Sequence, residues 1–185
     1  KFGVGPAVDN GFYYDISLPQ TISESDLKSI EKTMKKLTNH KLEMVREEMS
    51  LDDAVKFFQD KDQDFKVELL KDLKERGTTK VGEDLSDEVD LENPDQVSIY
   101  HTGEFADLCR GPHVDHIGET GVFKLIKVAG AYWRGDDSKA QMQRIYGVCF
   151  TTKEELSEYQ AMIEEAKKRD HRKIIKDLDL VTFSE

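Results

Sequence analysis

The chain has 185 residues, of which 37% are hydrophobic and 35% are charged, and its formal net charge is −11. This length fits one large domain or a domain with a helical appendage, and this hydrophobic content excludes a chain that is disordered throughout. The acidic balance argues against a nucleic-acid surface spread over the whole molecule, because phosphate binding needs a basic face. Clusters of basic residues at 121–150 and 167–173 still allow a local basic surface as well as an ordinary solvated face.

No stretch approaches the roughly 20 apolar residues of a membrane helix, and the first residues lack the pattern of a secretory signal. Only two cysteines occur, Cys109 and Cys149, too few for a disulfide framework and compatible with a reducing compartment. We therefore expect a cytoplasmic protein with no membrane partner. Because the chain starts at Lys1 without a Met, we also expect that further residues precede it in the parent protein.

The first forty residues predict a hairpin and a helix. Short apolar runs within 2–16 surround Asn10-Gly11, a pair that favours a tight turn between antiparallel strands. Ser23, with Asp26 three positions on, is a helix-start signal. Apolar residues then recur at helical spacing, so that we expect an amphipathic helix ending near residue 39.

The middle of the chain predicts a strand at 42–47 and a short helix capped by Ser50. Residues 65–70 read as another ordered element. Residues 72–96 are strongly charged and weakly periodic, which indicates a long acidic loop or insertion.

The last part of the chain predicts strands at 97–100, 121–133 and 141–150, because β-branched and aromatic residues are frequent there. Thr152 and Glu155 form a capping box at the start of a helix that we expect to reach about residue 175.

Strands and helices alternate without regular βαβ units, which predicts an α+β fold: an antiparallel sheet covered by helices, with a long C-terminal helix. We assign residues 1–150 to a domain that contains the acidic insertion and residues 151–185 to a helical linker.

One local feature suggests metal chemistry. Cys109 and His113 are four residues apart, a soft sulfur and an imidazole that can form half of a tetrahedral zinc site. The other candidates, His101, His116 and Cys149, show no matching spacing, so a buried cysteine beside a turn histidine is an equally good interpretation.

Lys66 also has two interpretations. A lysine within an apolar stretch can act on water, but ordinary surface lysines are far more numerous. The common nucleotide-binding and hydrolase motifs are absent from the sequence.

Three motifs together resemble the editing domain, or second additional domain, of bacterial-type threonyl-tRNA synthetases. They are residues 4–15 (VGPAVDNGFYYD), 109–113 (CRGPH) and 127–136 (KVAGAYWRGD), and residues 144–147 and 168–173 extend the resemblance toward the C-terminus. The resemblance covers nearly the whole chain. It implies that residues 1–150 are the editing domain and that 151–185 lead toward a catalytic core outside this sequence.

The resemblance implies an ester hydrolase that removes serine from the 3′ end of mischarged tRNA(Thr) for translational fidelity. Lys66, which positions or activates water, Asp107, which holds the substrate ammonium, and His113 are then the expected catalytic residues. The expected substrate-binding residues are Tyr14, near the terminal adenosine, together with Cys109 and Arg110.

The sequence departs from the family in one respect that matters. The His-x-x-x-His motif, which in the family precedes the Gly-Pro segment and activates water, is absent from the 185 residues. The 185 residues alone are therefore expected to be inactive, and a longer parent that contains the motif is expected to be active.

The resemblance implies no cofactor for editing, and it places ATP, a further zinc and a homodimer interface in the absent core. Two alternatives stay open: a zinc-dependent alanyl-type editing hydrolase with Cys109 and His113 as ligands, and a non-catalytic tRNA-binding module of a synthetase.

Overall fold

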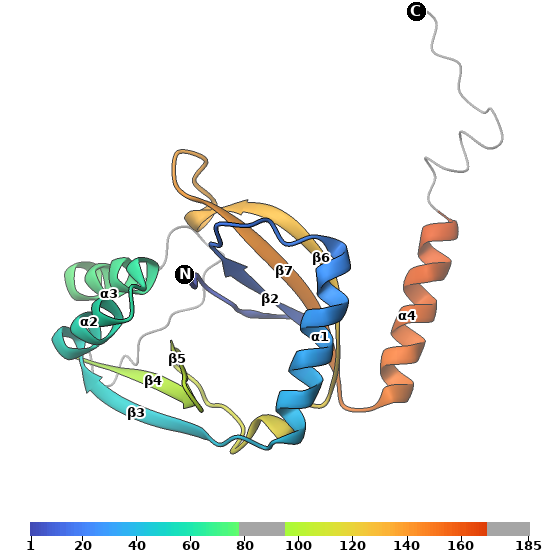
Figure 1. The fold of residues 1–185 in the computed structure, drawn as a ribbon, viewed down its shortest axis with the longest axis horizontal. Coiled ribbons are helices and arrows are strands. Elements are labelled where there is room, and N and C mark those ends of the chain that lie inside the picture. Colours follow the sequence, from blue (N-terminus) through green and yellow to red (C-terminus); the bar gives the residue numbers. More distant parts are fainter. Residues whose placement is uncertain (78–94, 170–185) are drawn as a thin grey trace, which may run out of the picture.

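The computed structural model describes residues 1–77 and 95–169 and has an α+β architecture (Figure 1). In chain order its elements are β1 (Ala7–Val8), β2 (Gly11–Ile16), α1 (Glu24–Asn39), β3 (Met44–Ser50), α2 (Leu51–Asp60), α3 (Asp64–Arg76), β4 (Gln96–Thr102), β5 (Phe105–Leu108), η1 (Ile117–Glu119), β6 (Val122–Tyr132), η2 (Trp133–Gly135), β7 (Gln141–Phe150) and α4 (Lys153–Lys168). The predicted fold class is confirmed. The single predicted sheet is wrong, because the described strands form a four-stranded sheet in the order β1-β2-β7-β6 and a three-stranded sheet in the order β3-β4-β5.

The predicted N-terminal hairpin is present, but its turn differs from the prediction. Val8 pairs with Gly11, so that Asp9 and Asn10 make the turn and neither Asn10 nor Gly11 has positive φ. Gly11 already lies in β2, where an added Cβ would come within 2.1 Å of the carbonyl oxygen of Gly147 in β7. Close packing of neighbouring strands, and not turn conformation, therefore requires this glycine.

Helix α1 begins as predicted and packs on the four-stranded sheet (Figure 1). The Ser23 backbone N–H donates to Asp26 Oδ2 at 2.8 Å, as a capping box requires. Leu27 is buried and packs with Leu125 of β6 and Ile145 of β7. This small apolar cluster attaches α1 to the sheet.

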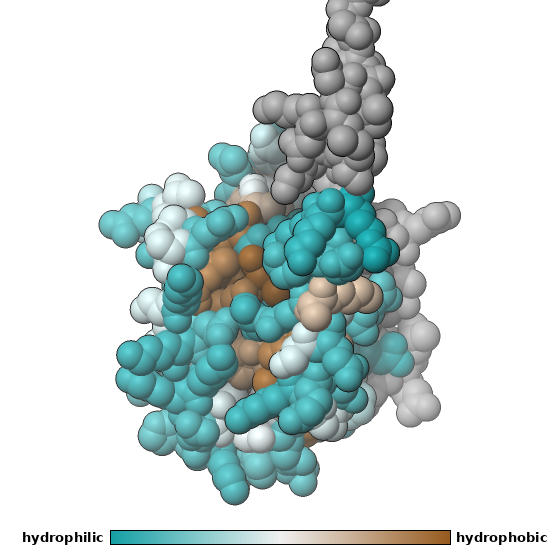
Figure 2. Space-filling model, turned by 90° about the vertical axis from the view of Figure 1, so that its right-hand side faces the viewer, coloured by the Kyte–Doolittle hydropathy of each residue, from teal (hydrophilic) through white to brown (hydrophobic). Residues whose placement is uncertain are grey.

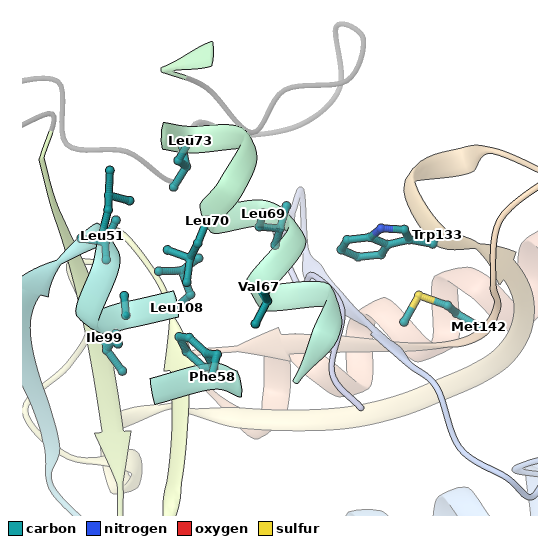
Figure 3. Packing of buried hydrophobic residues seen from close by; sticks show 12 residues of the cluster. Leu51, Phe58, Val67, Leu69, Leu70, Leu73, Ile99, Leu108, Trp133 and Met142 are labelled. Carbon is teal, nitrogen blue, oxygen red and sulfur yellow. The ribbon is translucent and has the colours of Figure 1, made fainter. Parts of the chain in front are cut away.

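A larger apolar core lies between α2, α3 and the three-stranded sheet (Figure 3). Ser50 caps α2 as predicted, since its Oγ accepts the backbone N–H of Asp53. The buried members of the core are Leu51, Ala54, Phe58, Val67, Leu69, Leu70, Leu73, Val97, Ile99, Leu108, Trp133 and Met142. Trp133 and Met142 come from η2 and β7, so this core also joins α3 to the four-stranded sheet.

The predicted acidic loop at 72–96 is wrong at its two ends, which belong to a helix and a strand. Helix α3 runs on to Arg76 and ends at Gly77 in the left-handed conformation, which is a common helix end. Gln96 already belongs to β4, and residues 78–94 lie outside the described part of the chain. The predicted strand at 42–47 is shifted to Met44–Ser50, and β5 was not predicted.

The C-terminal helix α4 starts with the predicted capping box, because the Thr152 hydroxyl accepts the backbone N–H of Glu155 at 3.2 Å. Its predicted end near residue 175 and most of the 168–173 motif lie outside the described residues. None of the described helices is long and apolar enough to cross a membrane. Hydrophilic side chains cover most of the face seen in Figure 2, around a central apolar area, as the high charge content leads one to expect.

Candidate functional site

A cavity of about 890 Å³ opens between β2, the start of α3, and the chain that follows β5. The six residues predicted from the sequence all line it: Tyr14, Lys66, Asp107, Cys109, Arg110 and His113. A larger hollow of about 1090 Å³ lies beside α4 and contains Cys149 but none of these six residues. The chemistry of the side chains, and not the size of the hollow, therefore selects the smaller cavity as the candidate site.

Lys66 is a buried cation in this cavity. It is the third residue of α3, only 2% of its side chain is exposed, and its Nζ lies 2.6 Å from Asp107 Oδ1. A buried ammonium is strongly unfavourable without an anionic partner. The ion pair with Asp107 therefore explains how the lysine can lie inside the molecule, and it rules out the ordinary surface lysine.

Asp107 joins three elements at one carboxylate. Besides Lys66 of α3, the Tyr14 hydroxyl of β2 donates to Oδ2, and the Leu108 backbone N–H donates to Oδ1 at 2.8 Å. An ionised carboxylate has roughly four acceptor positions, so about one position stays open for a donor from outside. The Tyr14 hydroxyl is thus already bonded to Asp107, which leaves the Tyr14 ring for contact with a ligand in the cavity. Lys66 Nζ lies 6.0 Å from the centroid of this ring.

Cys109 and His113 form a second pair in the same cavity. His113 Nε2 lies 3.1 Å from Cys109 Sγ, and the imidazole stands edge-on to the Tyr100 ring with 4.3 Å between centroids. His113 as a residue is exposed, but the covered part of its ring is enough for burial to lower the imidazole pKa, against a smaller opposing effect of Asp107. The pair therefore presents a sulfur and an imidazole that favours its neutral form.

Two features of the site were missed from the sequence. Tyr100 of β4 pairs directly with Asp107 of β5, so both side chains lie on one face of the small sheet. A Cβ added at Gly111 would lie only 2.0 Å from the Tyr100 hydroxyl. The loop that carries Cys109 and His113 therefore packs closely on this tyrosine. The signal would have been the β4–β5 register, which requires recognising the four-residue strand β5.

Arg110 lines the cavity and is exposed, whereas Lys66 is buried. This position suits contact with a large anionic ligand better than a role in bond breaking.

The metal hypothesis rests on two neighbouring donors, Cys109 and His113. Cys109 and His113 are close enough to share a metal, but within residues 1–77 and 95–169 no group of three or more His, Cys, Asp or Glu residues can hold an ion. His101 pairs with Glu47 and His116 with Glu119 instead. A zinc at this site would need further ligands from outside the described residues.

Comparison with known proteins supports the family resemblance that the motifs indicate. Residues 97–146 match the family described as the Threonyl and Alanyl tRNA synthetase second additional domain. This segment includes Asp107, Cys109 and His113 but neither Tyr14 nor Lys66.

Relatives match along the whole chain. A threonine–tRNA ligase of Dehalococcoides mccartyi is 47% identical over 183 residues, which are 99% of this chain and 28% of the relative. Threonine–tRNA ligases of Porphyromonas gingivalis and a Geobacillus species are 45% and 43% identical, and each match covers 100% of this chain and 26% of the relative. The resemblance to bacterial-type threonyl-tRNA synthetases is confirmed. The chain spans about a quarter of the length of these ligases.

Proposed function

We propose that this chain is the editing domain of a threonine–tRNA ligase and that, within the longer parent protein, it hydrolyses the ester of tRNA(Thr) mischarged with serine. The observation that carries the proposal is the buried Lys66 and Asp107 pair, held by Tyr14 in a cavity that Cys109 and His113 also line. Ionisable side chains gathered within hydrogen-bond reach of one another in a cavity are typical of a catalytic site.

A second hydrolytic site answers a physical problem of substrate selection. Threonine and serine differ by one methyl group, which is worth only roughly 1–3 kcal/mol in a binding pocket. An aminoacylation site alone therefore charges some tRNA with serine, and a separate site that excludes the extra methyl of threonine corrects the error.

In the proposed mechanism, Asp107 receives the ammonium group of the seryl ester at its remaining acceptor position. Lys66 then lies beside the ester, where its ammonium group stabilises the negative charge that develops on the carbonyl oxygen. Neutral His113 accepts a proton as water attacks. The ester C–O bond breaks, His113 returns the proton to the leaving tRNA oxygen, and free serine and the tRNA hydroxyl leave. The Tyr14 ring and Arg110 contact the terminal adenosine and the phosphate backbone.

The proposal is tested by measuring hydrolysis of seryl-tRNA(Thr) and threonyl-tRNA(Thr). The 185-residue chain and the parent protein with the residues that precede Lys1 are assayed side by side. We expect Lys66→Ala to lower seryl-tRNA hydrolysis by roughly 100-fold. Lys71→Ala is the matched control, because Lys71 is an exposed lysine on the same helix, and it should leave the rate unchanged. A loss of no more than a few-fold for Lys66→Ala rejects the role of this lysine.

The zinc-dependent alanyl-type hydrolase is the second candidate, and the contact between Cys109 Sγ and His113 Nε2 is the observation that favours it. Metal analysis of the purified protein separates the two. Stoichiometric zinc that disappears in Cys109→Ser supports this reading. Protein that binds tRNA but hydrolyses no ester, with or without the preceding residues, supports a non-catalytic module.

We also propose that aminoacylation, with its ATP and zinc, and dimerisation belong to the part of the ligase outside this chain. The partial coverage of the relatives supports this division.

A further inference from the structure

Trp133 and Arg134, near the end of the 127–136 motif, do not line the cavity but contact α3. Trp133 is 1% exposed, and its ring packs on Phe65 with 4.7 Å between ring centroids. Its indole N–H donates to Glu68 Oε2 at 2.9 Å. Figure 3 shows the indole beside α3, at the end of the core nearest the four-stranded sheet.

Arg134 continues this contact with its charge. Only 5% of its side chain is exposed, and its Nη1 forms ion pairs with Asp72 and, at 3.5 Å, with Glu68. The contact with Asp72 Oδ2 is an ion pair and lacks hydrogen-bond geometry. Lys139 reaches Glu68 at 3.2 Å from the same loop. Cationic and indole groups of residues 133–139 therefore hold two carboxylates of α3.

The backbone of Arg134 adopts a conformation that is unfavourable for a residue other than glycine. Its φ is 57°, in the left-handed region, and its Nε and Nη2 are buried without a hydrogen-bond partner among the described residues. Such a conformation persists only where the surrounding structure fixes it. The contacts available to fix it are the ion pairs with Asp72 and Glu68 and the backbone hydrogen bonds on either side of Arg134, from Trp133 N–H to Ala140 and from Asp136 N–H to Trp133.

The contacts of α3 lie on one helix face. Phe65, Glu68 and Asp72 are three and four residues apart and share a face, whereas Lys66 points into the cavity. Asp107 belongs to the small sheet and Tyr14 to the large sheet, and their hydrogen bond joins the two. The position of Lys66 Nζ at 2.6 Å from Asp107 therefore depends on where α3 sits against both sheets.

We infer that Trp133 and Arg134, with Glu68 and Asp72, form a clamp that positions Lys66 against Asp107. We call these four residues the α3 clamp. They are positioning residues, because they act through Lys66 and do not line the cavity. The consequence for hydrolysis rests on the proposed function, but the placement of Lys66 does not.

The test measures the accessibility of Lys66 directly. Reductive methylation with formaldehyde and a borohydride, followed by mass spectrometry, gives the labelling rate of each lysine in the 185-residue chain. Lys71 of the same helix is the internal reference. Trp133→Phe keeps an aromatic ring on Phe65 and removes the indole N–H, and Glu68→Gln keeps the side-chain size and removes the charge. We expect each variant to raise the labelling of Lys66 relative to Lys71 at least threefold.

Two controls separate positioning from loss of stability. Asp52→Asn breaks the exposed ion pair of Asp52 with Lys74, which also attaches α3 but lies outside the clamp, and should leave Lys66 labelling unchanged. Ile99→Val removes one methyl from the same apolar core at a residue that is not a member of the clamp. If Lys66 labelling stays at the original level in the clamp variants, or rises equally in Ile99→Val at the same melting temperature, the inference is wrong.

Hydrolysis of seryl-tRNA(Thr) adds a second readout. In the clamp variants of the parent protein we expect kcat to fall at least fivefold while KM stays the same, since the proposed binding contacts are untouched. Raised Lys66 labelling with unchanged kcat overturns the positioning role. If the original protein has no hydrolytic activity, the proposed function fails, and the labelling result alone decides the clamp.

Discussion

At the scale of single residues, the site is organised around the carboxylate of Asp107, which is paired with three donors. Its side chain is 18% exposed, forms an ion pair with Lys66, and accepts hydrogen bonds from the Tyr14 hydroxyl and the Leu108 backbone N–H. Low surrounding polarity strengthens each of these contacts. Burial also disfavours the charged form of His113 and so lowers the pKa of its imidazole.

His113 gives a prediction about pH. Because its pKa lies below the ordinary value of about 6.5, the imidazole stays neutral to lower pH than a solvated histidine. Hydrolysis that uses neutral His113 should therefore persist at pH 6.5 and decline only as pH falls through the lowered pKa. The imidazole Cε1–H resonance, followed by NMR against pH, measures this pKa. A value above 6.5 contradicts the prediction.

The neighbouring charge provides a control on its cause. Asp107 raises the pKa of His113 and so opposes the effect of burial. Removing the negative charge in Asp107→Asn should lower the pKa of His113 further. An upward shift in the variant means that Asp107 is not the group that acts on the imidazole.

Gly111 gives a prediction about stability. Its φ is +73°, and a Cβ there would lie 2.0 Å from the Tyr100 hydroxyl, so Gly111→Ala combines backbone strain with a steric clash. We expect a loss of roughly 2–4 kcal/mol in the free energy of unfolding, measured by urea titration. Gly77→Ala is the control, because Gly77 has a φ of +70° but nothing within 4 Å of its Cβ position. It should cost only about 1 kcal/mol, and equal costs for both variants would exclude the Tyr100 clash.

At the scale of elements, the predictions held where the signal lies within one segment. The capped helices starting after Ser23, Ser50 and Thr152 are present, and the strand predicted at 141–150 matches β7. The division into two sheets was missed, because pairing of β2 with β7 and of β3 with β4 joins residues far apart in the sequence. Strand β5 was missed because it has only four residues. The end of α3 was missed because its last turn is as charged as the sequence that follows it.

Two helix caps give a matched prediction at this scale. Ser50 caps α2, which buries Leu51, Ala54 and Phe58, whereas α4, capped by Thr152, buries none of its residues. Ser50→Ala should therefore lower global stability by about 1 kcal/mol. Thr152→Ala should fray α4 and leave global stability almost unchanged, because little else depends on that helix.

Two measurements separate these outcomes. Fluorescence of Trp133, the single tryptophan and a buried core residue, follows global unfolding in urea. Hydrogen exchange of the α4 amides follows local fraying. Equal shifts of the fluorescence transition in both variants would mean that α4 is part of the cooperative core.

At the scale of the whole molecule, the site lies where the two sheets meet. The six predicted site residues could be named from the family resemblance, but their distances depend on closure of the small sheet and α3 onto the large sheet. Lys66 illustrates the limit: its sequence neighbours are compatible with a surface lysine, and only the fold brings Asp107 of a distant strand to its ammonium group.

The connection between the sheets predicts one cooperative unfolding unit. The described residues hold two apolar clusters, one around Leu70 and one around Leu27, but the first also contains Trp133 and Met142 from the side of the large sheet. Leu70→Ala and Leu27→Ala should each cost roughly 2–5 kcal/mol, because each leaves a cavity in a buried cluster. If the sheets are coupled as the shared core indicates, both variants shift the same single transition, seen alike by Trp133 fluorescence and by far-ultraviolet circular dichroism. If Leu27→Ala splits the two signals, the large sheet unfolds apart from the small one, and the site between them is lost when the first sheet unfolds.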